Sequence, residues 1–403
     1  MGLEIDKIFD SFDRNGIFKD KSVLQSNYKP DTILHREEQI KQIASILAPV
    51  LRGERSSNLF LYGKTGTGKT LSIQYVQEEL LKRSKKDADF QLKIKYLNCK
   101  LRKVSDTEYR ILAELIRKLG GEIPTTGLPT ESVYSKFIEI IDKEKQLIVL
   151  IFDEIDQAVK KISDNFLYNL TRLNSELSNA QICIVGISND LTFLDSLDPR
   201  IKSSLSEEEL VFPPYNALQI QDILNNRAEN SFKKGVLEEG VVAKCAAFAA
   251  REHGDARRAL DLLRVAGELA ERDGSKRVLL KHIDEANNKI ERDKILDVVK
   301  TEPKQFQLVL LSIIKLSESQ KKEPIFTGDV YNLYQEVCKT NNTEILTQRR
   351  VGDIVQEFDM LGIINVTVIS KGRGGRMREI KLAINNKIME EVKKIIKDSL
   401  NYN

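Results

Sequence analysis

The sequence predicts an α/β domain built on a parallel sheet, followed by a helical domain and a C-terminal winged helix-turn-helix domain. In the first half, short apolar runs alternate with helical patterns, as in a parallel sheet covered by helices. Residues 216–292 are helical throughout and rich in alanine and leucine. Beyond residue 304, three helical segments precede two β-rich segments. We expect the domains to span 1–213, 214–295 and 296–403.

Length and composition set limits on the kind of protein. A chain of 403 residues is too long for one core. Lys and Arg number 63 against 60 Asp and Glu, so a nucleic-acid surface would have to be a local cluster. The four cysteines and three histidines are scattered, which favours neither disulfides nor a zinc site. The acidic start and the short longest apolar run, 147–152, predict a cytoplasmic protein without signal peptide or membrane span.

The first segments lead into the sheet. Residues 1–30 are mixed in charge and are expected to form an arm or a short helix. A helix then opens at 35–38, and its apolar positions fall on one face at Ile40, Ile43, Ile46 and Leu47. This helix delivers the chain to the first strand, an apolar run at 58–62.

The segment after that strand has the spacing G-x4-G-K-T of the phosphate-binding loop of nucleotide hydrolases. Glycines let successive N–H groups converge on a polyphosphate, and the helix opening at Lys69 adds its positive dipole end. Lys69 would reach the outer phosphates, and the Thr70 hydroxyl would hold Mg²⁺. A glycine-rich turn that binds nothing is the alternative, and the strand–turn–helix context disfavours it. The predicted nucleotide-binding residues are Gly63, Lys64, Thr65, Gly66, Thr67, Gly68, Lys69, Thr70 and Leu71.

The elements that follow continue the alternation. A helix over 70–82 precedes a strand at 92–97, and another helix is expected at 131–142. Between them, the helical segment 100–119 carries six basic residues against three acidic ones. An ordinary solvated helix face explains this charge on the residues alone.

A second motif lies at the end of the strand 146–152, which is apolar at nearly every position and therefore buried on both faces. Asp153 and Glu154 follow it, at the strand edge where ligands bind such sheets. Asp153 can hold the Mg²⁺ shell, and Glu154 can orient or deprotonate an attacking water. The buried strand 182–188 places Asn189 at the same edge, where it could contact the γ-phosphate or the water. A plain turn asparagine is the alternative.

Two arginines lie where a helix dipole disfavours a cation. Asp198 and Pro199 start a helix as N-cap and first residue, which puts Arg200 in its first turn. Asp255 caps a second helix after Gly254, with Arg257 in its first turn. Each arginine is better explained if it meets an anion, and a solvated surface arginine is the alternative.

The C-terminal region follows what we expect to be a charged linker over 293–303. Helices are predicted at 305–317, 327–339 and 347–361, and β-rich segments at 363–370 and 377–384. The third helix starts with polar and basic residues, and the tip of the hairpin is basic and glycine-rich, which suits base edges and phosphates. A merely soluble hairpin is the alternative. The predicted DNA-binding residues here are Thr347, Gln348, Arg349, Arg350, Lys371, Arg373, Gly374, Arg376 and Arg378.

The order of these motifs closely resembles that of the archaeal origin-recognition and cell-division-cycle type (Orc/Cdc) replication initiators of the AAA+ class. The resemblance implies an AAA+ core, a helical lid and a winged helix. It makes Asn189 the first sensor, Arg257 the second, and Arg200 an arginine finger acting on a neighbour's nucleotide. Arg36 and Tyr215 would lie near the adenine. Residues 100–118 fall where the family carries a DNA-touching insertion, which would make Arg102 and Lys103 DNA contacts.

The resemblance also implies an activity. The chain would bind ATP or ADP with Mg²⁺ and grip duplex origin DNA, with hydrolysis slow because the finger needs a partner. A paralogous initiator and the replicative helicase are the implied protein partners. Two other classes remain open. One is a clamp-loader-like ATPase that remodels protein rings, which the basic winged helix disfavours. The other is a signalling ATPase whose winged helix is a structural spacer or a protein-binding module.

Overall fold

The computed structural model describes residues 16–84, 90–100, 107–124, 127–205, 207–319, 324–370 and 376–400. The chain divides into two compact units, Met1–Ile283 and Asp284–Asn403, which are described separately below. Within the described part of the chain, no helix combines the length and the hydropathy that crossing a membrane requires.

A five-stranded parallel sheet forms the centre of the first unit, in the order β2-β3-β4-β1-β5. Every residue of β3 is buried, as predicted from its uninterrupted apolar run. The carboxyl ends of β1, β3 and β4 therefore meet at one edge. The strands span Asn58–Tyr62 (β1), Gln91–Asn98 (β2), Gln146–Asp153 (β3), Ala180–Ser188 (β4) and Glu207–Val211 (β5).

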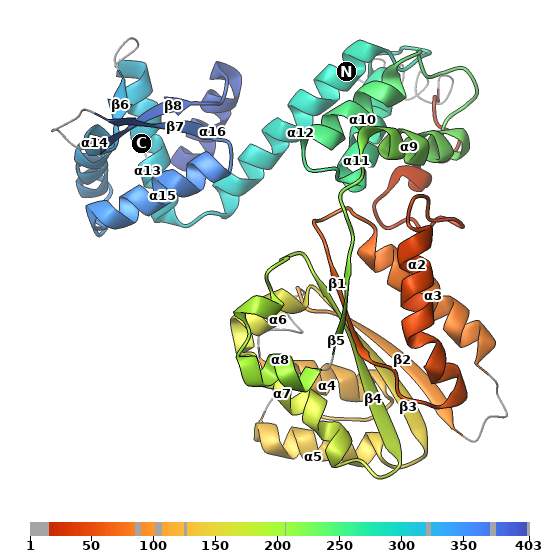
Figure 1. Cartoon of the computed structure of the whole chain (residues 1–403). Coiled ribbons are helices and arrows are strands. Elements are labelled where there is room, and N and C mark those ends of the chain that lie inside the picture. Colours follow the sequence, from red (N-terminus) through yellow and green to blue (C-terminus); the bar gives the residue numbers. More distant parts are fainter. Residues whose placement is uncertain are drawn as a thin grey trace, which may run out of the picture. The chain divides into compact units, whose positions relative to one another are not determined.

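Helices cover both faces of this sheet (Figure 1). Successive residues of β1 serve opposite faces: Leu59 and Leu61 pack in the core under α2 and α3, while Phe60 and Tyr62 pack in the core on the other face. Helices α6 and α7 were not anticipated from the sequence. The helices span Glu37–Leu47 (α2) and Lys69–Arg83 (α3) on one face, and Glu108–Lys118 (α4), Thr130–Ile141 (α5), Ile155–Ile162 (α6), Asn165–Arg172 (α7) and Pro199–Leu205 (α8) on the other.

The helical lid belongs to the same compact unit as the sheet. It contains α9 (Ala217–Ser231), α10 (Val241–Arg251), α11 (Ala256–Arg272) and the start of α12 (Leu280–Thr301). The buried face of α11 carries the alanines and leucines that predicted it. The N-terminal strap, residues 16–34, runs against this lid: its 3₁₀ turn Lys21–Leu24 packs on α9 and α11.

The predicted linker over 293–303 is wrong, because α12 continues without a break from Leu280 to Thr301. Its apolar residues Ile295, Leu296 and Val299 follow helical spacing and are buried in the core of the second unit. The charged residues between them occupy the other side of the helix. A high density of charge therefore marked an exposed helix face rather than a linker.

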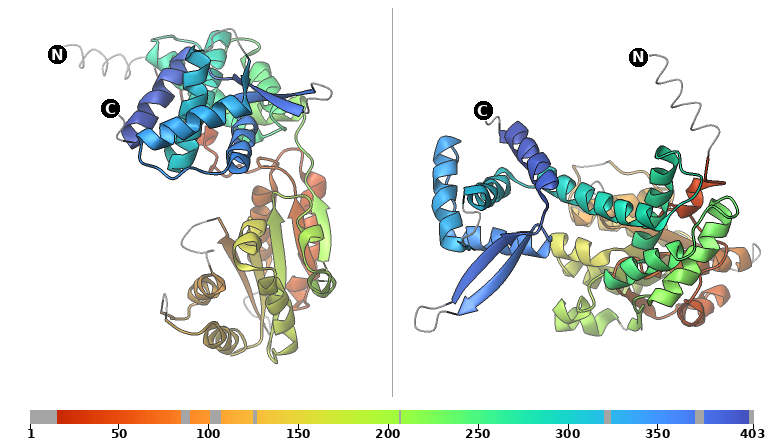
Figure 2. Two further views of the ribbon diagram at one scale, coloured as in Figure 1. Left: turned by 90° about the vertical axis from the view of Figure 1, so that its left-hand side faces the viewer. Right: turned by 90° about the horizontal axis from the view of Figure 1, so that it is seen from above.

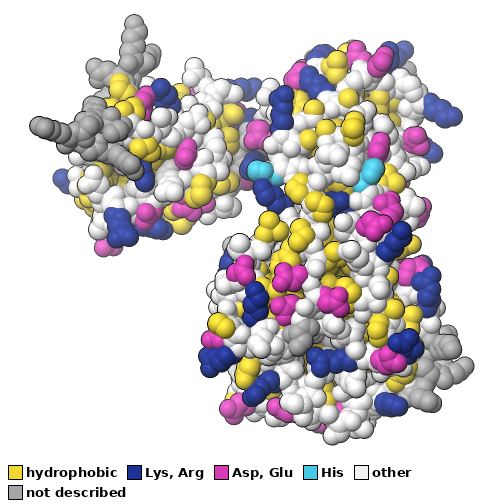
Figure 3. All heavy atoms as spheres, in the orientation of Figure 1, with side chains coloured by type: hydrophobic (Ala, Val, Ile, Leu, Met, Phe, Trp, Pro, Cys, Tyr) yellow, Lys and Arg dark blue, Asp and Glu magenta, His cyan; other side chains and the backbone are white. Residues whose placement is uncertain are grey.

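The second unit is a winged helix, as predicted. Helices α13 (Lys304–Ser319), α14 (Thr327–Thr340) and α15 (Gln348–Met360) precede the antiparallel hairpin of β7 (Ile364–Ser370) and β8 (Arg376–Leu382), which projects beyond the helices (Figure 2). The sequence did not predict the short strand β6 (Ile325–Phe326), which pairs with β8, or helix α16 (Asn386–Leu400). On the face in Figure 3, side chains of both charges are interspersed over the described part of each unit.

Candidate functional site

The loop between β1 and α3 has the backbone of a phosphate cradle. Gly66 has φ of +73° and Gly68 has φ of +90°, in the left-handed region that glycine adopts without steric cost. Tertiary contacts also exclude a side chain: a Cβ on Gly66 would lie 1.8 Å from Oδ1 of Asp255 in the lid. The glycines of the motif thus serve both the turn and the close approach of the lid.

Lys69 points back into this loop. Its Nζ donates to the carbonyl oxygens of Gly63 (2.5 Å) and Lys64 (2.8 Å) and to Oδ1 of Asn189 (3.0 Å). Burial lowers the pKa of Lys69 to about 8, although the nearby Asp153 carboxylate opposes the shift. The structure therefore brings the loop lysine and Asn189 together, as their places at two strand ends predicted.

The carboxylate of Asp153 is held from three directions. Its Oδ2 accepts hydrogen bonds from Thr70 Oγ1 (2.9 Å) and from the Tyr96 hydroxyl (2.6 Å), and its Oδ1 accepts from the backbone N–H of Glu154 (3.0 Å). Burial and the bond to Asp153 raise the pKa of Tyr96 above its usual value, so its hydroxyl remains a donor. Thr70 and Asp153, the predicted metal residues, are thus in direct contact.

Glu154 has a left-handed backbone with φ of +55°, which is uncommon for a residue with a side chain. Its Oε2 lies 3.6 Å from Nζ of Lys100, which follows β2. The conformation turns the chain from β3 directly into α6, and Glu154 still lines the cavity described below.

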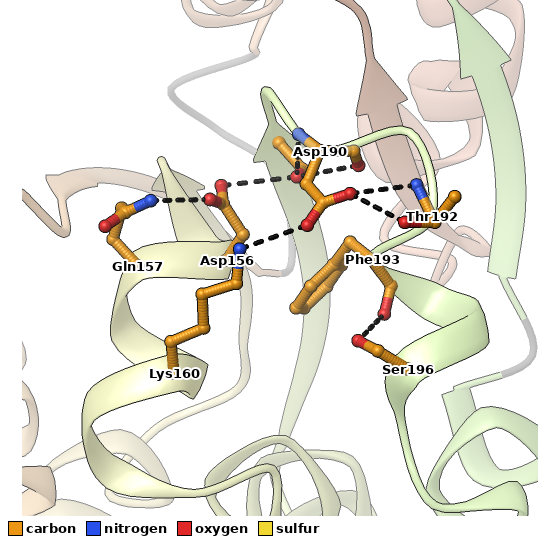
Figure 4. A network of polar contacts seen from close by, with 8 residues as sticks. Asp156, Gln157, Lys160, Asp190, Thr192, Phe193 and Ser196 are labelled. Atoms are coloured by element: carbon orange, nitrogen blue, oxygen red, sulfur yellow. Dashed lines mark hydrogen bonds and ion pairs between the residues drawn. The ribbon is translucent and has the colours of Figure 1, made fainter. Parts of the chain in front are cut away.

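The turn that carries Asn189 is fixed by a polar network (Figure 4). Asp190 forms an ion pair with Lys160 of α6 (3.1 Å), which holds the pKa of that carboxyl below its usual range. Ser188 donates to the buried carboxylate of Asp156 (3.2 Å) and accepts from the backbone N–H of Asp190 (3.0 Å). The network ties the end of β4 to α6 and so positions Asn189.

A cavity of about 440 Å³ opens over these groups. Its lining also contains Arg257 of the lid and Tyr215. The predicted residues that line it are Thr65, Gly66, Thr67, Gly68, Lys69, Thr70, Leu71, Asp153, Glu154, Asn189, Tyr215 and Arg257.

Sequence reasoning missed the strap and lid residues that also line this cavity. Ile33 and Leu34 from the strap and Ile223 and Leu260 from the lid supply apolar surface there. The Tyr28 ring, also in the lining, lies 4.5 Å from the guanidinium carbon of Arg227. No motif marks these residues, because they come from distant parts of the chain and share only apolar or aromatic character.

Arg36, which the resemblance places near the adenine, contacts two residues of the cavity lining, Thr67 and Tyr215. It is buried and does not line the cavity. Its guanidinium lies 3.7 Å from the centroid of the Tyr215 ring and donates to the carbonyl oxygens of Thr67 (2.8 Å) and Pro213 (2.5 Å). In the described structure, Arg36 therefore supports the phosphate loop from behind.

The two first-turn arginines have different surroundings. Arg257 is exposed in the lid and lines the cavity. Burial is the main cause of the lowered pKa of Lys69, and the charge of Arg257 lowers this pKa further. Arg200 lies outside the cavity lining and pairs with its own cap, since Nη2 is 2.9 Å and Nε 3.1 Å from the Asp198 carboxylate. The anion expected beside this first-turn arginine is thus the Asp198 carboxylate of the same chain.

The candidate nucleic-acid residues of the winged helix are partly described. Thr347 caps α15, and Gln348, Arg349 and Arg350 are exposed in its first turn. Arg378 is exposed on β8, and its Nη1 lies 3.4 Å from the carbonyl oxygen of Gly352, which links the wing to α15. The remaining predicted contacts lie outside the described residues or, for Arg376, have an undescribed side chain: Arg102, Lys103, Lys371, Arg373, Gly374 and Arg376.

Three family models match successive parts of the chain. Residues 52–193 match the AAA domain, 221–288 the Cdc6 AAA+ ATPase-type lid domain, and 297–392 the C-terminal winged helix domain of CDC6. An ORC1-type DNA replication protein of Pyrococcus abyssi is 51% identical over 95% of this chain and 91% of that protein. The ORC1-type DNA replication protein 1 of Methanosarcina acetivorans is also 51% identical, over 94% and 91%. The chain belongs to this ORC1-type family.

Solved structures agree with that assignment. The ORC1 protein of Aeropyrum pernix, solved in complex with DNA, superposes with a TM-score of 0.83 at 43% identity and covers 95% of this chain and 97% of its own. Cdc6p of Pyrobaculum aerophilum shares the fold, with a TM-score of 0.60 at 22% identity. The ORC1-type protein described here is a DNA replication initiator with a nucleotide-binding AAA+ ATPase core. The resemblance drawn from motif order is confirmed.

Proposed function

We propose that this ORC1-type protein binds ATP or ADP with Mg²⁺ in the cavity above the phosphate loop and, in that state, binds duplex DNA at replication origins. The observation that carries the nucleotide site is the meeting of Lys69, Asn189, Thr70 and Asp153 at the carboxyl ends of three strands. The apolar strap and lid residues of the cavity lining suit a base. A magnesium ion would neutralise phosphate charge when bound.

Different residues of the chain bind the phosphates, hold the metal ion and activate the attacking water. The loop N–H groups and Lys69 hold the phosphates, and Arg257 adds a cation from the lid. Thr70 and Asp153 would hold the Mg²⁺ shell. Among the described residues, no group of three or more acidic, His or Cys side chains could bind a metal ion by itself. The phosphates would therefore supply further ligands to the Mg²⁺. Glu154 orients the attacking water and takes its proton. Asn189, fixed by its network, orients the water or the γ-phosphate.

Hydrolysis by the isolated chain is slow in this proposal. Arg200 is exposed, lies outside the cavity lining and is paired with Asp198. It would act on the nucleotide of an adjacent, paralogous initiator, so full activity needs a second molecule. We propose the replicative helicase as a further partner. The proposed location of the protein is the nucleoid, in the cytoplasm.

DNA binding is supported by the winged helix and by the Aeropyrum pernix relative that was solved with DNA. The exposed first turn of α15 would enter a groove, and the wing would contact phosphates or a narrow groove. Arg102 and Lys103 would add contacts from the AAA+ unit. ORC1-type family membership weighs against the clamp-loader and signalling alternatives.

The decisive experiment is a binding selection of the full chain, with ADP, against fragmented genomic DNA at near-physiological salt. We expect enrichment of a few discrete loci, and weaker binding with a flatter salt dependence for Arg349→Ala and Arg376→Ala, because each removes a phosphate or base contact. Lys315→Ala, which removes a charge outside the predicted DNA contacts, is the control. Uniform weak binding by the native protein would contradict a site-specific initiator.

A further inference from the structure

Tyr96 is a residue at the candidate site that no motif singled out. It lies in β2, opposite Ile151 of β3, and its ring packs at the edge of the core under α2 and α3. Its hydroxyl reaches the cavity and lies 2.6 Å from Oδ2 of Asp153. This distance is at the short end for a hydroxyl donor, as expected when the acceptor is a carboxylate.

The hydrogen bond completes the support of one carboxylate. Oδ2 of Asp153 accepts from Tyr96 and from Thr70 (2.9 Å), and Oδ1 accepts from the backbone of Glu154 (3.0 Å). Three donors from β2, α3 and the turn after β3 fix the plane of the carboxylate. A Thr70 hydroxyl that directs its proton at Asp153 keeps both oxygen lone pairs for another ligand.

We propose that Tyr96 is a positioning residue for the divalent cation that accompanies the bound nucleotide. It touches neither nucleotide nor cation in this role. It holds Asp153 in the orientation that directs the Thr70 proton away from the cation position. The inference rests on the proposed function, because it takes Thr70 and Asp153 as the metal residues.

The role of the hydroxyl can be separated from that of the ring. Tyr96→Phe keeps the aromatic packing in the strand and removes only the donor to Asp153. Tyr62 offers a matched control in the same sheet: it lies at the end of β1, it is buried, and its hydroxyl has no hydrogen-bond partner within the described ranges. Tyr62→Phe therefore removes a buried phenolic oxygen without disturbing a carboxylate.

The test is calorimetric binding of ADP to the full chain, in EDTA and over a series of Mg²⁺ concentrations. For Tyr96→Phe we expect a rise, on the order of tenfold, in the Mg²⁺ concentration that gives half of the Mg²⁺-dependent gain in ADP affinity, as for other residues that support metal ligands. The ADP affinity in EDTA should stay within about twofold of the native protein. Tyr62→Phe should match the native protein in both conditions. Because each variant is compared with itself, a general loss of folded protein does not change the outcome.

Two results would overturn the inference. An unchanged Mg²⁺ dependence in Tyr96→Phe would remove the positioning role, and an equal loss of affinity with and without Mg²⁺ would reduce the residue to packing. Asp153→Asn separates this failure from that of the proposed function. If Asp153→Asn abolishes the Mg²⁺ effect and Tyr96→Phe does not alter it, only the inference fails. If Asp153→Asn leaves the effect intact, the metal assignment itself fails.

Discussion

Lys69 is the residue whose chemistry depends most on the folded environment. Its ammonium is buried and surrounded by the oxygens of Gly63, Lys64 and Asn189. Neutral oxygens satisfy the hydrogen-bond donors but compensate the charge only in part, so burial lowers its pKa to about 8. A polyphosphate would add the negative charge that the site lacks.

This leads to a pH dependence of nucleotide affinity. In the free protein Lys69 loses its proton near pH 8, whereas bound phosphates favour the charged form and raise its pKa. Below pH 8 the lysine is charged in both states, and the affinity should be flat. Above pH 8 binding must take up a proton, and the affinity should fall by up to about tenfold per pH unit. Calorimetry of ADP binding from pH 6.5 to 9.5, in buffers of different ionisation enthalpy, measures both the affinity and the number of protons taken up on binding.

Two variants serve as references for that profile. Lys64→Ala removes an exposed loop cation that contacts His253 (3.2 Å), and it should retain the bend near pH 8. Lys69→Ala should lose most of the affinity and the bend with it. A native profile that stays flat to pH 9.5 would contradict the assignment of Lys69 to the phosphates.

At the scale of elements, the N-terminal strap is the part that the sequence described least. Its Phe18 ring stacks on Phe232 with centroids 4.8 Å apart, and the backbone N–H of Lys19 donates to the Ser231 carbonyl (2.8 Å). Gly267 of α11 makes room for it, because a Cβ there would lie 2.4 Å from the Phe18 ring. The strap is thus anchored on the lid before it lines the nucleotide cavity.

Phe18→Ala should therefore speed the release of nucleotide. Loss of an aromatic stack is worth about 0.5–1.5 kcal/mol, which corresponds to a few-fold to about tenfold faster ADP dissociation if the strap must detach first. Stopped-flow chasing of a fluorescent ADP measures this rate. Lys19→Ala, an exposed change in the same strap, should release ADP at the native rate. Equal rates for Phe18→Ala and the native protein would show that the strap does not limit release.

The whole molecule consists of two compact units, and the described residues that line the proposed nucleotide cavity belong to the first. A ligand stabilises what it binds by mass action, and this amounts to about 2.7 kcal/mol at a hundredfold excess over Kd. Nucleotide binding should therefore increase the free energy of unfolding of the first unit alone.

Scanning calorimetry should resolve this as two transitions of different sensitivity. Saturating ADP should raise the transition of the Met1–Ile283 unit by roughly 5 °C or more and leave that of the Asp284–Asn403 unit in place. In Lys69→Ala, examined under the same conditions, ADP should shift neither transition. A single transition that rises as a whole with ADP would contradict this prediction, because it would mean that the two units unfold as one cooperative body.

Local periodicity was sufficient for much of the fold. Four of the five sheet strands and the phosphate loop were predicted from the sequence, because a buried strand and a cradle of N–H groups each impose their own residue types. The fifth strand, Glu207–Val211, begins with three acidic residues and carries no such signal. The sequence pattern did not predict the structure where the same pattern fits two different structures. The charge of 293–303 fits a linker or an exposed helix face, and only the burial of Ile295, Leu296 and Val299 in a distant core distinguishes them.

The sequence by itself determined that this protein has a phosphate loop, a carboxylate pair at a strand end, a helical lid and a winged helix, because those signals lie in consecutive residues. Only the tertiary structure decided which side chains complete the site. Arg36 is buried and donates to the carbonyl oxygen of Thr67 in the loop, and Tyr96 and the strap reach the site from other elements. The physical reason is that a contact between distant segments depends on how the sheet and lid bring them together, which no local spacing records.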